Sequence, residues 1–411
     1  MIKLLRKKKF ILIIFLIFYL TINYSIPSID FVVPVNVIGS KKSHAQQNSK
    51  ILYKNSNGSA KINFLVNQVG NFGSEKIGVT KCTEDVEFET TTDESEADIL
   101  FYHMFVPKKV AYNKYNKTQY SMVFSLESEA HSPLGDTWKN ADFRMWYNLD
   151  LSYPAPVTYF DVKVYLVDLL SPAKVEFENK IKEASVVWIV SNCNAYNGRE
   201  NYIKKLMSYI KIDSYGACLN NKRTHTADRM KGNIELYSRY KFVIAIENSN
   251  CKDYVSEKLV HAIGSGSIPI VAGKSDKPDY LRFIPKHSYI NIYDYESPKK
   301  LADHIINISK NKTLYEGYIN FKRNDFKREY LDTLALPELI KLANTSFYKN
   351  ETFMKQLVSK EKSENKICKI VRYVANTDPV TIKKEIEKNK RNRPLASEAC
   401  LPLGNLVSDF V

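Results

Sequence analysis

The residues best suited to bind a phosphorylated ligand lie in one segment, Tyr240–Gly273, where charged and small polar side chains interrupt an apolar pattern. An apolar run in this segment ends at a carboxylate and an amide, Glu247 and Asn248, just before a stretch with helical spacing begins. The carboxyl end of a buried strand is where open α/β sheets bind their ligands. This boundary is therefore the first candidate site.

The predicted helix that follows runs from about Tyr254 to Ile263, with Asp253 as its expected N-cap. Its first turn contains Ser256, Glu257 and Lys258. Backbone N–H groups and an ammonium at a helix N-terminus suit a diphosphate, and a neighbouring carboxylate suits ribose hydroxyls. Periodicity alone favours a plainer interpretation, an ordinary capped helix with a surface Glu–Lys pair.

Two further polar clusters stand where an apolar run gives way to another pattern. In Ser191–Tyr202 the first helical turn carries Arg199, whose guanidinium could fork onto a phosphate or be a simple surface charge. In Ser125–Pro133 the carboxylate of Glu127 follows an apolar strand, and His131 lies four residues on. A carboxylate at a strand tip could accept a proton from an acceptor hydroxyl, although either side chain could also be structural.

The elements that would position these residues form two blocks. In the first block, short apolar runs predict buried strands at Ile62–Val66, Ala97–Phe105 and Met122–Glu127. In the second block, strands and helices alternate, which predicts a parallel sheet covered on both faces. The predicted strands and helices of this block are Val186–Val190, Asn201–Ile210, Lys241–Ile246, Ile268–Gly273, Tyr289–Tyr293 and Lys299–Ile308.

The N-terminus has the pattern of a membrane signal anchor. Five basic residues within residues 1–9 precede the apolar run Phe10–Ile22, which extends to about Ile26 without a small-residue cleavage site. Positive charge before the span predicts a cytosolic tail and a lumenal body. The loose polar stretch Pro27–Ser49 is typical of a stem. The alternative is a cleaved secretory signal.

Glycosylation triplets and cysteines fit a lumenal, oxidising compartment. The chain contains an even number of cysteines, as disulfides require, although some could be free buried thiols. Cys368 and Cys400 bracket a basic stretch, Lys383–Arg393, and could tie it back to the body. The candidate N-glycosylation sites are Asn57, Asn116, Asn307, Asn311, Asn344 and Asn350.

Composition indicates a folded protein that does not act on nucleic acid. Hydrophobic residues make up 44% of the 411 residues and charged residues 26%, which is enough apolar material for about two globular domains. The net charge of +15 comes mostly from scattered lysines, which are typical of a solvated surface. The signal anchor also removes the chain from compartments that contain nucleic acid.

The segment Tyr240–Gly273, YKFVIAIENSNCKDYVSEKLVHAIGSGSIPIVAG, strongly resembles the donor-binding signature of the α-1,3-fucosyltransferase family, glycosyltransferase family 10. WIVSNCNAYNGRENYIKKL and KIDSYGAC resemble the family's Val-Ser-Asn-Cys and Asp-x-Tyr-Gly segments. SLESEAHSP resembles its Leu-Glu-Ser-Pro-x-His stretch. Together these matches cover about residues 120–310.

This resemblance implies an α/β fold of GT-B type, with two Rossmann-like domains facing a cleft. It also implies inverting transfer of L-fucose from GDP-β-L-fucose to a GlcNAc-containing glycan on a glycoprotein or glycolipid, in the Golgi membrane. Glu127 would be the catalytic base, and Arg199 and Lys258 would neutralise the departing diphosphate. The implied donor-binding residues are Arg199, Asn248, Tyr254, Glu257 and Lys258.

Three further expectations accompany the resemblance. Cys193 and Cys218 occupy family contexts and are expected to pair. No Asp-x-Asp at a strand end suggests a metal site, so no cofactor is expected, and stimulation by Mn²⁺ stays open. The expected order is a cytosolic tail at 1–9, an anchor at 10–26, a stem at 27–60, an acceptor-side domain at 61–178, a donor domain at 179–345 and a basic extension at 346–411.

The chain departs from the family pattern on the acceptor side. Where the family carries Tyr-Arg-Arg-Asp-Ser-Asp, residues 147–152 read Tyr-Asn-Leu-Asp-Leu-Ser, and Glu129 replaces a usual proline. Because the donor signature is intact, we interpret the departure as altered acceptor choice. The alternatives are a catalytically weak lumenal glycan-binding or scaffold protein that keeps the fold, and a transferase that uses another sugar nucleotide.

Overall fold

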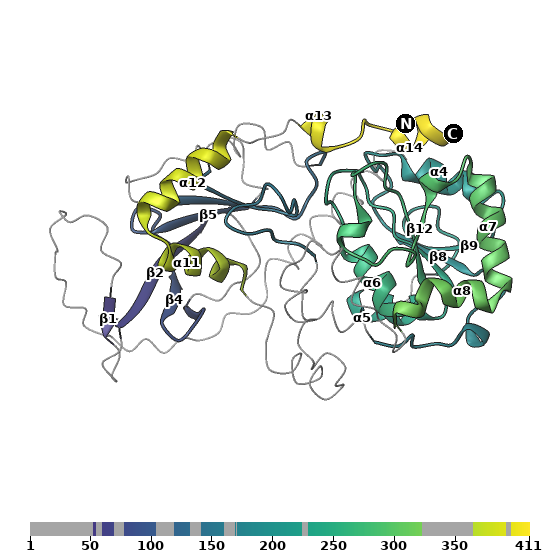
Figure 1. Ribbon diagram of the computed structural model, residues 1–411, viewed down its shortest axis with the longest axis horizontal. Helices are drawn as coiled ribbons and strands as arrows, with labels where there is room; N and C mark the ends of the chain where they lie inside the picture. Colours follow the sequence, from purple (N-terminus) through teal and green to yellow (C-terminus); the bar gives the residue numbers. More distant parts are fainter. Residues whose placement is uncertain are drawn as a thin grey trace, which may run out of the picture. The chain divides into compact units, whose positions relative to one another are not determined.

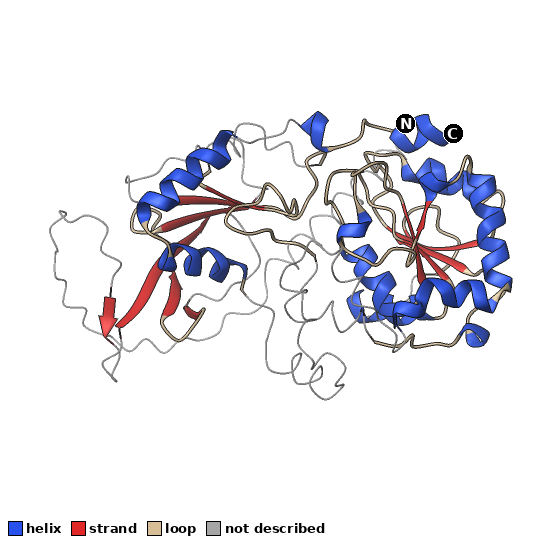
Figure 2. Ribbon diagram, in the orientation of Figure 1, coloured by secondary structure: helices blue, strands red, loops and turns tan. Residues whose placement is uncertain are grey.

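The described part of the chain contains two β-sheets (Figure 1 and Figure 2). Apolar cores lie on both faces of each sheet. The computed structural model describes residues 52–54, 60–69, 78–103, 119–131, 141–159, 169, 171–223, 229–322, 365–391 and 396–411. All of them belong to one compact unit, Asn48–Val411.

The first sheet is mainly parallel. Within the described residues its strand order is β3-β4-β2-β5-β6-β7, with β1 paired to β2 outside this path. Only β1 and β3 run antiparallel to their partners. The strands are β1 Leu52–Lys54, β2 Ala60–Val69, β3 Val79–Lys81, β4 Val86–Thr90, β5 Ile99–His103, β6 Tyr120–Phe124 and β7 Phe143–Met145. β2, β5 and β6 confirm the three strands predicted for the first block.

The two faces of this sheet belong to different cores, because side chains alternate along each strand. On β5, Phe101 belongs to one core and its neighbour Tyr102 to the other. Helices α11 (Lys366–Asn376) and α12 (Pro379–Arg391) pack on the Phe101 face, where both lie beside the strands in Figure 1. The Tyr102 face shares its core with Tyr254, a residue of the donor segment.

The stretch predicted as a basic C-terminal extension contributes to both sheets. Ile370 of α11 and Ile382 of α12 are buried in the core of the first sheet, while Lys383, Lys384 and Lys388 of α12 are exposed. Leu406 of α14 (Asn405–Phe410) is buried in a core of the second sheet. The disulfide between Cys82 and Cys368 ties α11 to the first sheet.

The second sheet is wholly parallel, as predicted for the second block. Its strands lie in the order β12-β11-β10-β8-β9. The chain leaves β8 toward β9 on one side and leaves β10 toward β11 on the other, so the order reverses between β8 and β10. The strands are β8 Val186–Val190, β9 Ile212–Gly216, β10 Phe242–Ile244, β11 Ile268–Val271 and β12 Ile290–Asn291.

Helices cover both faces of the second sheet (Figure 2). Helices α5 and α6 share a core with Val243, whereas α4, α7 and α8 share the opposite core with Phe242. The helices are α4 Arg199–Leu206, α5 Arg229–Ser238, α6 Glu257–Ser265, α7 Pro298–Lys310 and α8 Lys312–Ile319, and a short α13 spans Ala396–Ala399. Single turns of 3-10 helix occupy η1 Phe177–Asn179, η2 Tyr280–Arg282, η3 Ile292–Asp294 and η4 Asn320–Lys322.

The predicted anchor at residues 10–26 lies outside the described residues, as does most of the predicted stem. β1 falls within the stretch predicted as stem, where it pairs with β2. In the described part of the chain, no helix combines the length and apolar character that crossing a bilayer requires.

Candidate functional site

The candidate site lies where the strand order of the second sheet reverses. β8 and β10 are adjacent and parallel, with Phe242 opposite Val186. The helix that follows β8, α4, packs on one face of the sheet, and the helix that follows β10, α6, packs on the other. The loops after the two strands therefore leave the sheet at its switch point, which is where doubly wound sheets place the crevice that binds their ligands. The segments predicted to bind the donor form these two loops.

Asn197 ties the two loops together. Its backbone N–H donates to the carbonyl of Asn248 at 3.2 Å. Its side-chain amide donates to the carbonyl of Glu247 at 2.9 Å and to Oδ1 of Asn250 at 2.6 Å. Because Asn197, Glu247 and Asn250 are buried, their bonds are shielded from water and hold the loops in one register. Asn197 was not predicted, because nothing in the local sequence distinguishes it from other loop asparagines.

Arg199 is buried at the start of α4, with 1% of its surface exposed. Its guanidinium donates to the carbonyl of Ile246 at 2.8 Å and to that of Asn192 at 3.2 Å. Burial lowers its pKa, and the carboxylates of Glu200 and Glu247 oppose that effect. In the structure, Arg199 therefore fixes the ends of the two loops through their backbone oxygens.

Helix α6 begins at Glu257, and Ser256 is its N-cap, so the prediction of Asp253 as the cap was wrong. Glu247, at the end of the preceding strand, holds Ser256 in place. One carboxylate oxygen accepts the backbone N–H of Ser256 at 2.7 Å, and the other accepts its hydroxyl at 2.7 Å. Asp253 has a positive φ of 59°, so the chain does not enter the helix there.

Lys258 places an ammonium at the start of α6. Its Nζ lies 3.1 Å from Glu247 and 3.1 Å from Glu257, and it donates to the hydroxyl of Ser256 at 2.9 Å. Burial lowers the pKa of Lys258, but the two carboxylates outweigh burial and raise it. Burial raises the pKa of Glu257, but the charge of the Lys258 ammonium and its hydrogen bond together lower it below its usual value. With 21% of its side chain exposed, Lys258 stays charged and accessible to an anion.

Glu127 comes from the first sheet and meets the donor segment through Tyr254. It lies three residues beyond the end of β6, where its backbone N–H donates to Oγ of Ser125 at 3.1 Å. The Tyr254 hydroxyl donates to the Glu127 carboxylate at 3.3 Å. Burial raises the pKa of Tyr254 well above its usual value, so the phenol stays protonated. The structure thus brings together a carboxylate and a donor-segment residue that are far apart in sequence.

A second bond joins the same two loops. The hydroxyl of Ser249 donates to that of Ser128 at 2.6 Å, and both side chains are buried. Asn248, the remaining predicted donor-binding residue, lies next to this bond and accepts from Ser249 at 3.2 Å. All six predicted catalytic and donor-binding residues therefore lie on the loops after β6, β8 and β10 or at the helix ends that follow them.

The C-terminal segment is joined to these loops by hydrogen bonds and a disulfide. The N–H groups of Gly404 and Leu406 donate to the carbonyls of Tyr196 and Asn197, at 2.8 and 3.0 Å. Cys400 forms a disulfide with Cys251 in the loop after β10. Cys193 and Cys218, the pair suggested by the family resemblance, are also joined by a disulfide. Cys368 and Cys400 thus each tie the C-terminal stretch to a different sheet.

The other predicted positions lie away from the crevice. Asn307 and Asn311 are exposed on and just after α7, and the Oδ1 of Asn311 accepts the N–H of Leu314 as the cap of α8. Asn57, Asn116, Asn344 and Asn350 lie outside the described residues. Where the structure describes the chain, no three metal-ligating side chains gather.

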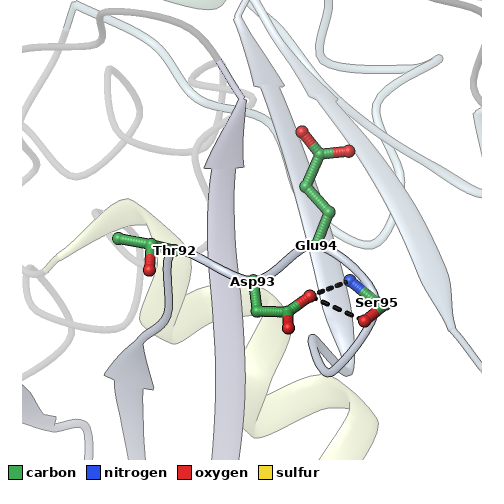
Figure 3. A pocket seen from close by; sticks show the side chains of 4 residues that line it. All are labelled: Thr92, Asp93, Glu94 and Ser95. Carbon is green, nitrogen blue, oxygen red and sulfur yellow. Dashed lines mark hydrogen bonds between the residues drawn. The ribbon is translucent and has the colours of Figure 1, made fainter.

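A surface hollow at the loop that connects β4 to β5 is separate from this site. It is lined by Thr92, Asp93, Glu94 and Ser95 (Figure 3). The Asp93 carboxylate accepts from the N–H and the hydroxyl of Ser95, at 2.8 and 2.6 Å. These bonds close a local turn on itself, and none of the predicted site residues lies in it.

Residues 179–388 match the sequence profile described as glycosyltransferase family 10 (fucosyltransferase), C-terminal part. The match covers half of the chain, so the chain belongs to glycosyltransferase family 10. It contains the loops after β8 and β10 and the whole of α6.

Named relatives agree with this assignment. Glycoprotein 3-alpha-L-fucosyltransferase A of Drosophila melanogaster is 34% identical over 279 residues, 65% of this chain and 54% of that protein. 4-Galactosyl-N-acetylglucosaminide 3-alpha-L-fucosyltransferase 9 of Bos taurus is 34% identical over 201 residues, 49% of this chain and 52% of that protein. The chain thus spans about half the length of the relatives it matches. A crystal structure of an alpha1,3-fucosyltransferase with GDP-fucose is 17% identical, with a TM-score of 0.48 over 70% of this chain and 91% of that one.

Proposed function

We propose that the chain is an inverting α-1,3-fucosyltransferase, which transfers L-fucose from GDP-β-L-fucose to a GlcNAc-containing glycan on a glycoprotein. Family membership and the names of the relatives support the donor and the linkage. The reversal of strand order in the second sheet supports a nucleotide site at the loops after β8 and β10. The two sheets would form the two halves of a GT-B fold.

The observation that carries the proposal is the contact between Tyr254 and Glu127. It joins a carboxylate of the first sheet to the segment that presents Lys258 at the start of α6. A base and a cation for a leaving diphosphate are the two groups that an inverting transfer needs. They are contributed here by loops more than a hundred residues apart.

In the proposed reaction, a hydroxyl oxygen of the acceptor attacks the anomeric carbon of fucose. The bond between that carbon and the diphosphate oxygen breaks, GDP departs, and the configuration at carbon inverts. The proton of the attacking hydroxyl passes to Glu127, and Lys258 neutralises the charge that develops on the diphosphate. The buried contacts of Asn197 and Arg199 hold the loops that carry Asn248 and Glu257 around the nucleotide.

A Golgi location, with residues 1–9 cytosolic and the body lumenal, belongs to the same proposal. The pattern of residues 1–26 supports it, and so do three disulfides that an oxidising lumen would preserve. Asn307 and Asn311 are exposed, as glycan acceptors must be. A shift in mass on glycan removal from the expressed chain would support the lumenal location, and an unmodified chain would contradict it. Added Mn²⁺ would act, if at all, as a stimulator rather than as a required cofactor.

The proposal is tested by replacing the base alone. Glu127→Gln keeps the shape and the bond to Tyr254 but removes the proton acceptor, so transfer of labelled fucose by the full-length chain should fall by about 10²–10⁴-fold. GDP affinity should change by less than about twofold, because the diphosphate contacts lie on the other sheet. Comparable transfer by this variant would disprove the role of Glu127.

The wild-type chain decides between the proposal and its alternatives. Transfer from GDP-fucose to N-acetyllactosamine or to an N-glycan core supports the proposal. A chain that binds glycans but transfers nothing would be a scaffold that kept the fold. Competition by UDP but not GDP would indicate a different sugar nucleotide.

A further inference from the structure

A cluster of four charged side chains joins the two sheets beside the candidate site. Arg282, at the end of η2, donates from one nitrogen to both carboxylate oxygens of Asp253, at 2.7 and 2.8 Å. Its other terminal nitrogen donates to Asp150 at 2.8 Å. Lys252 also approaches Asp150, at 2.9 Å. Lys252 also lies 4.0 Å from Asp276, and Arg282 contacts both Asp150 and Asp253.

The cluster connects chain segments that neither sheet would hold together alone. Asp150 follows β7 of the first sheet, whereas Asp253 and Arg282 belong to the loops around the second sheet. Asp253 also accepts the backbone N–H of Leu149 at 3.0 Å. Residues 147–152 contain no cation of their own, so Lys252 and Arg282 supply the positive charge that Asp150 meets.

The buried charge and the backbone conformation of Asp253 are both unfavourable without its partners in this cluster. It is 1% exposed and adopts a positive φ, which costs free energy for a residue other than glycine. Burial raises its pKa, and the Arg282 guanidinium opposes that effect. A buried carboxylate without a partner is strongly unfavourable, so Arg282 stabilises the unusual backbone at this point.

The backbone of Asp253 in turn sets the position of Tyr254. The next residue along the chain, Tyr254, packs its ring edge-to-face on Tyr147, with centroids 5.0 Å apart. Its hydroxyl reaches Glu127. A path of direct contacts therefore runs from Arg282 through Asp253 and Tyr254 to the carboxylate of the first sheet.

We propose that Arg282 is a positioning residue for the transfer reaction. By holding Asp150 and Asp253 together, it fixes the loop of the first sheet against the entrance of α6 and so aligns Glu127 with the ligand held near Lys258. This inference rests on the proposed fucosyltransferase activity. It predicts that Arg282 affects the turnover of bound substrates and leaves nucleotide binding almost unchanged.

The test compares two mild variants of the full-length chain with the wild type. Arg282→Lys keeps the charge but cannot fork onto two carboxylates, and Asp150→Asn removes a partner that is 48% exposed. Both should lower kcat for transfer to N-acetyllactosamine by about tenfold or more, since small misplacements of reacting groups are costly. GDP affinity should stay within about twofold, and Tm should fall only slightly. Lys299→Met, which breaks an exposed ion pair on α7, is the matched control.

A double-variant cycle distinguishes positioning from general stability. If Arg282 acts through Tyr254, then Arg282→Lys should cost much less, about twofold, in a Tyr254→Phe background. Equal losses in both backgrounds, or losses of kcat and GDP affinity in the same proportion, would overturn the inference. Unchanged kcat in both single variants would do so too. A wild-type chain without any transfer would instead refute the proposed function itself.

Discussion

The donor-binding segment and the acceptor-facing loops differ in how far apart their contacts lie in the sequence. On the donor side, Ser256 binds Glu247 across nine residues and Lys258 binds Ser256 across two. On the acceptor side, Glu127 meets Tyr254 across 127 residues, and Asp150 meets Arg282 across 132. The charged cluster at the start of α6 is therefore built within one segment, whereas the acceptor side exists only once both sheets have folded.

Local and long-range clusters of side chains differ in what keeps them assembled. A local cluster stays assembled as long as its helix and strand form, because loop closure costs little over short separations. A long-range cluster depends on the packing of both sheets and on every tie between them. Changes within the donor cluster should therefore abolish transfer. Changes to the contacts and disulfides that join separate segments should affect donor binding and transfer to different extents.

The largest effect is expected from Lys258. Lys258→Met removes the ammonium but keeps most of the apolar stem, so the departing diphosphate loses its cation at the helix N-terminus. The value of kcat/KM for transfer should fall by about 10²–10³-fold, as when one preorganised charge-stabilising group is removed. Steady-state assays with the full-length chain measure this loss, and GDP titration measures the weaker affinity.

The control for this prediction is Lys299→Met, which removes an exposed lysine from α7. It should leave both transfer and GDP affinity unchanged. If Lys258→Met kept transfer within about threefold of the wild type, the cation would have to come from elsewhere. Arg199 would be a poor substitute, because its guanidinium is engaged with backbone carbonyls.

Most of the donor side could be predicted from the sequence, because its contacts lie close together along the chain. The strand, loop and helix of Tyr240–Gly273 follow one another, and their periods are visible in a short window. The start of α6 was misplaced by three residues because Asp253 has the composition of an N-cap. Its carboxylate instead binds Arg282, 29 residues on, and no local pattern reveals that preference.

The acceptor side and the C-terminal stretch were less predictable. The cluster around Arg282 depends on contacts between separate segments, so spacing gives no sign of it. By contrast, α11 carries a detectable signal, since Ile367, Ile370, Val371 and Val374 recur at helical spacing and all are buried. The lysines that follow α11 indicated a solvated tail, so the apolar face of α12 was not predicted.

The two long-range disulfides allow the donor side and the acceptor side to be tested independently. Replacing Cys251 and Cys400 by serine frees the C-terminal segment from the loop after β10, which carries Asn248. Replacing Cys82 and Cys368 removes the covalent tie between α11 and the first sheet, and neither cysteine lies on the loops after β8 and β10. Each change should lower the free energy of unfolding by about 2–5 kcal/mol, because each disulfide closes a long loop.

Only the first pair should alter donor binding. We expect the KM for GDP-fucose to rise several-fold, by about three to ten, when Cys251 and Cys400 are replaced, because the hydrogen bonds to the loop carbonyls loosen. The Cys82 and Cys368 variant, assayed below its lowered Tm, should keep a donor KM close to that of the wild type. Equal changes in donor KM for the two pairs would contradict a donor site braced by the C-terminal segment.

The smallest expected effect concerns the stability of the donor-bearing sheet rather than its site. Lys180 is buried, and its Nζ donates to the carbonyls of Ser238 and Tyr240 at 2.7 and 3.1 Å. Burial lowers its pKa to about 7. Between about pH 7 and the usual lysine pKa of about 10.4, the unfolded chain holds a proton that the folded chain lacks.

Because the unfolded state binds more protons in that window, this group makes the free energy of unfolding rise with pH, by at most about 1.4 kcal/mol per pH unit. Below pH 7 both states are protonated, so the contribution of Lys180 becomes constant and the cost of its buried charge is fully present. Lys180→Met should lack the slope, while its kinetic constants match those of the wild type, since the side chain touches neither loop of the crevice. Denaturant unfolding at several pH values between 7.5 and 9.5 measures the difference between the two proteins. Parallel curves would mean that the lysine stays charged in the folded protein, held by the carbonyls at the end of α5.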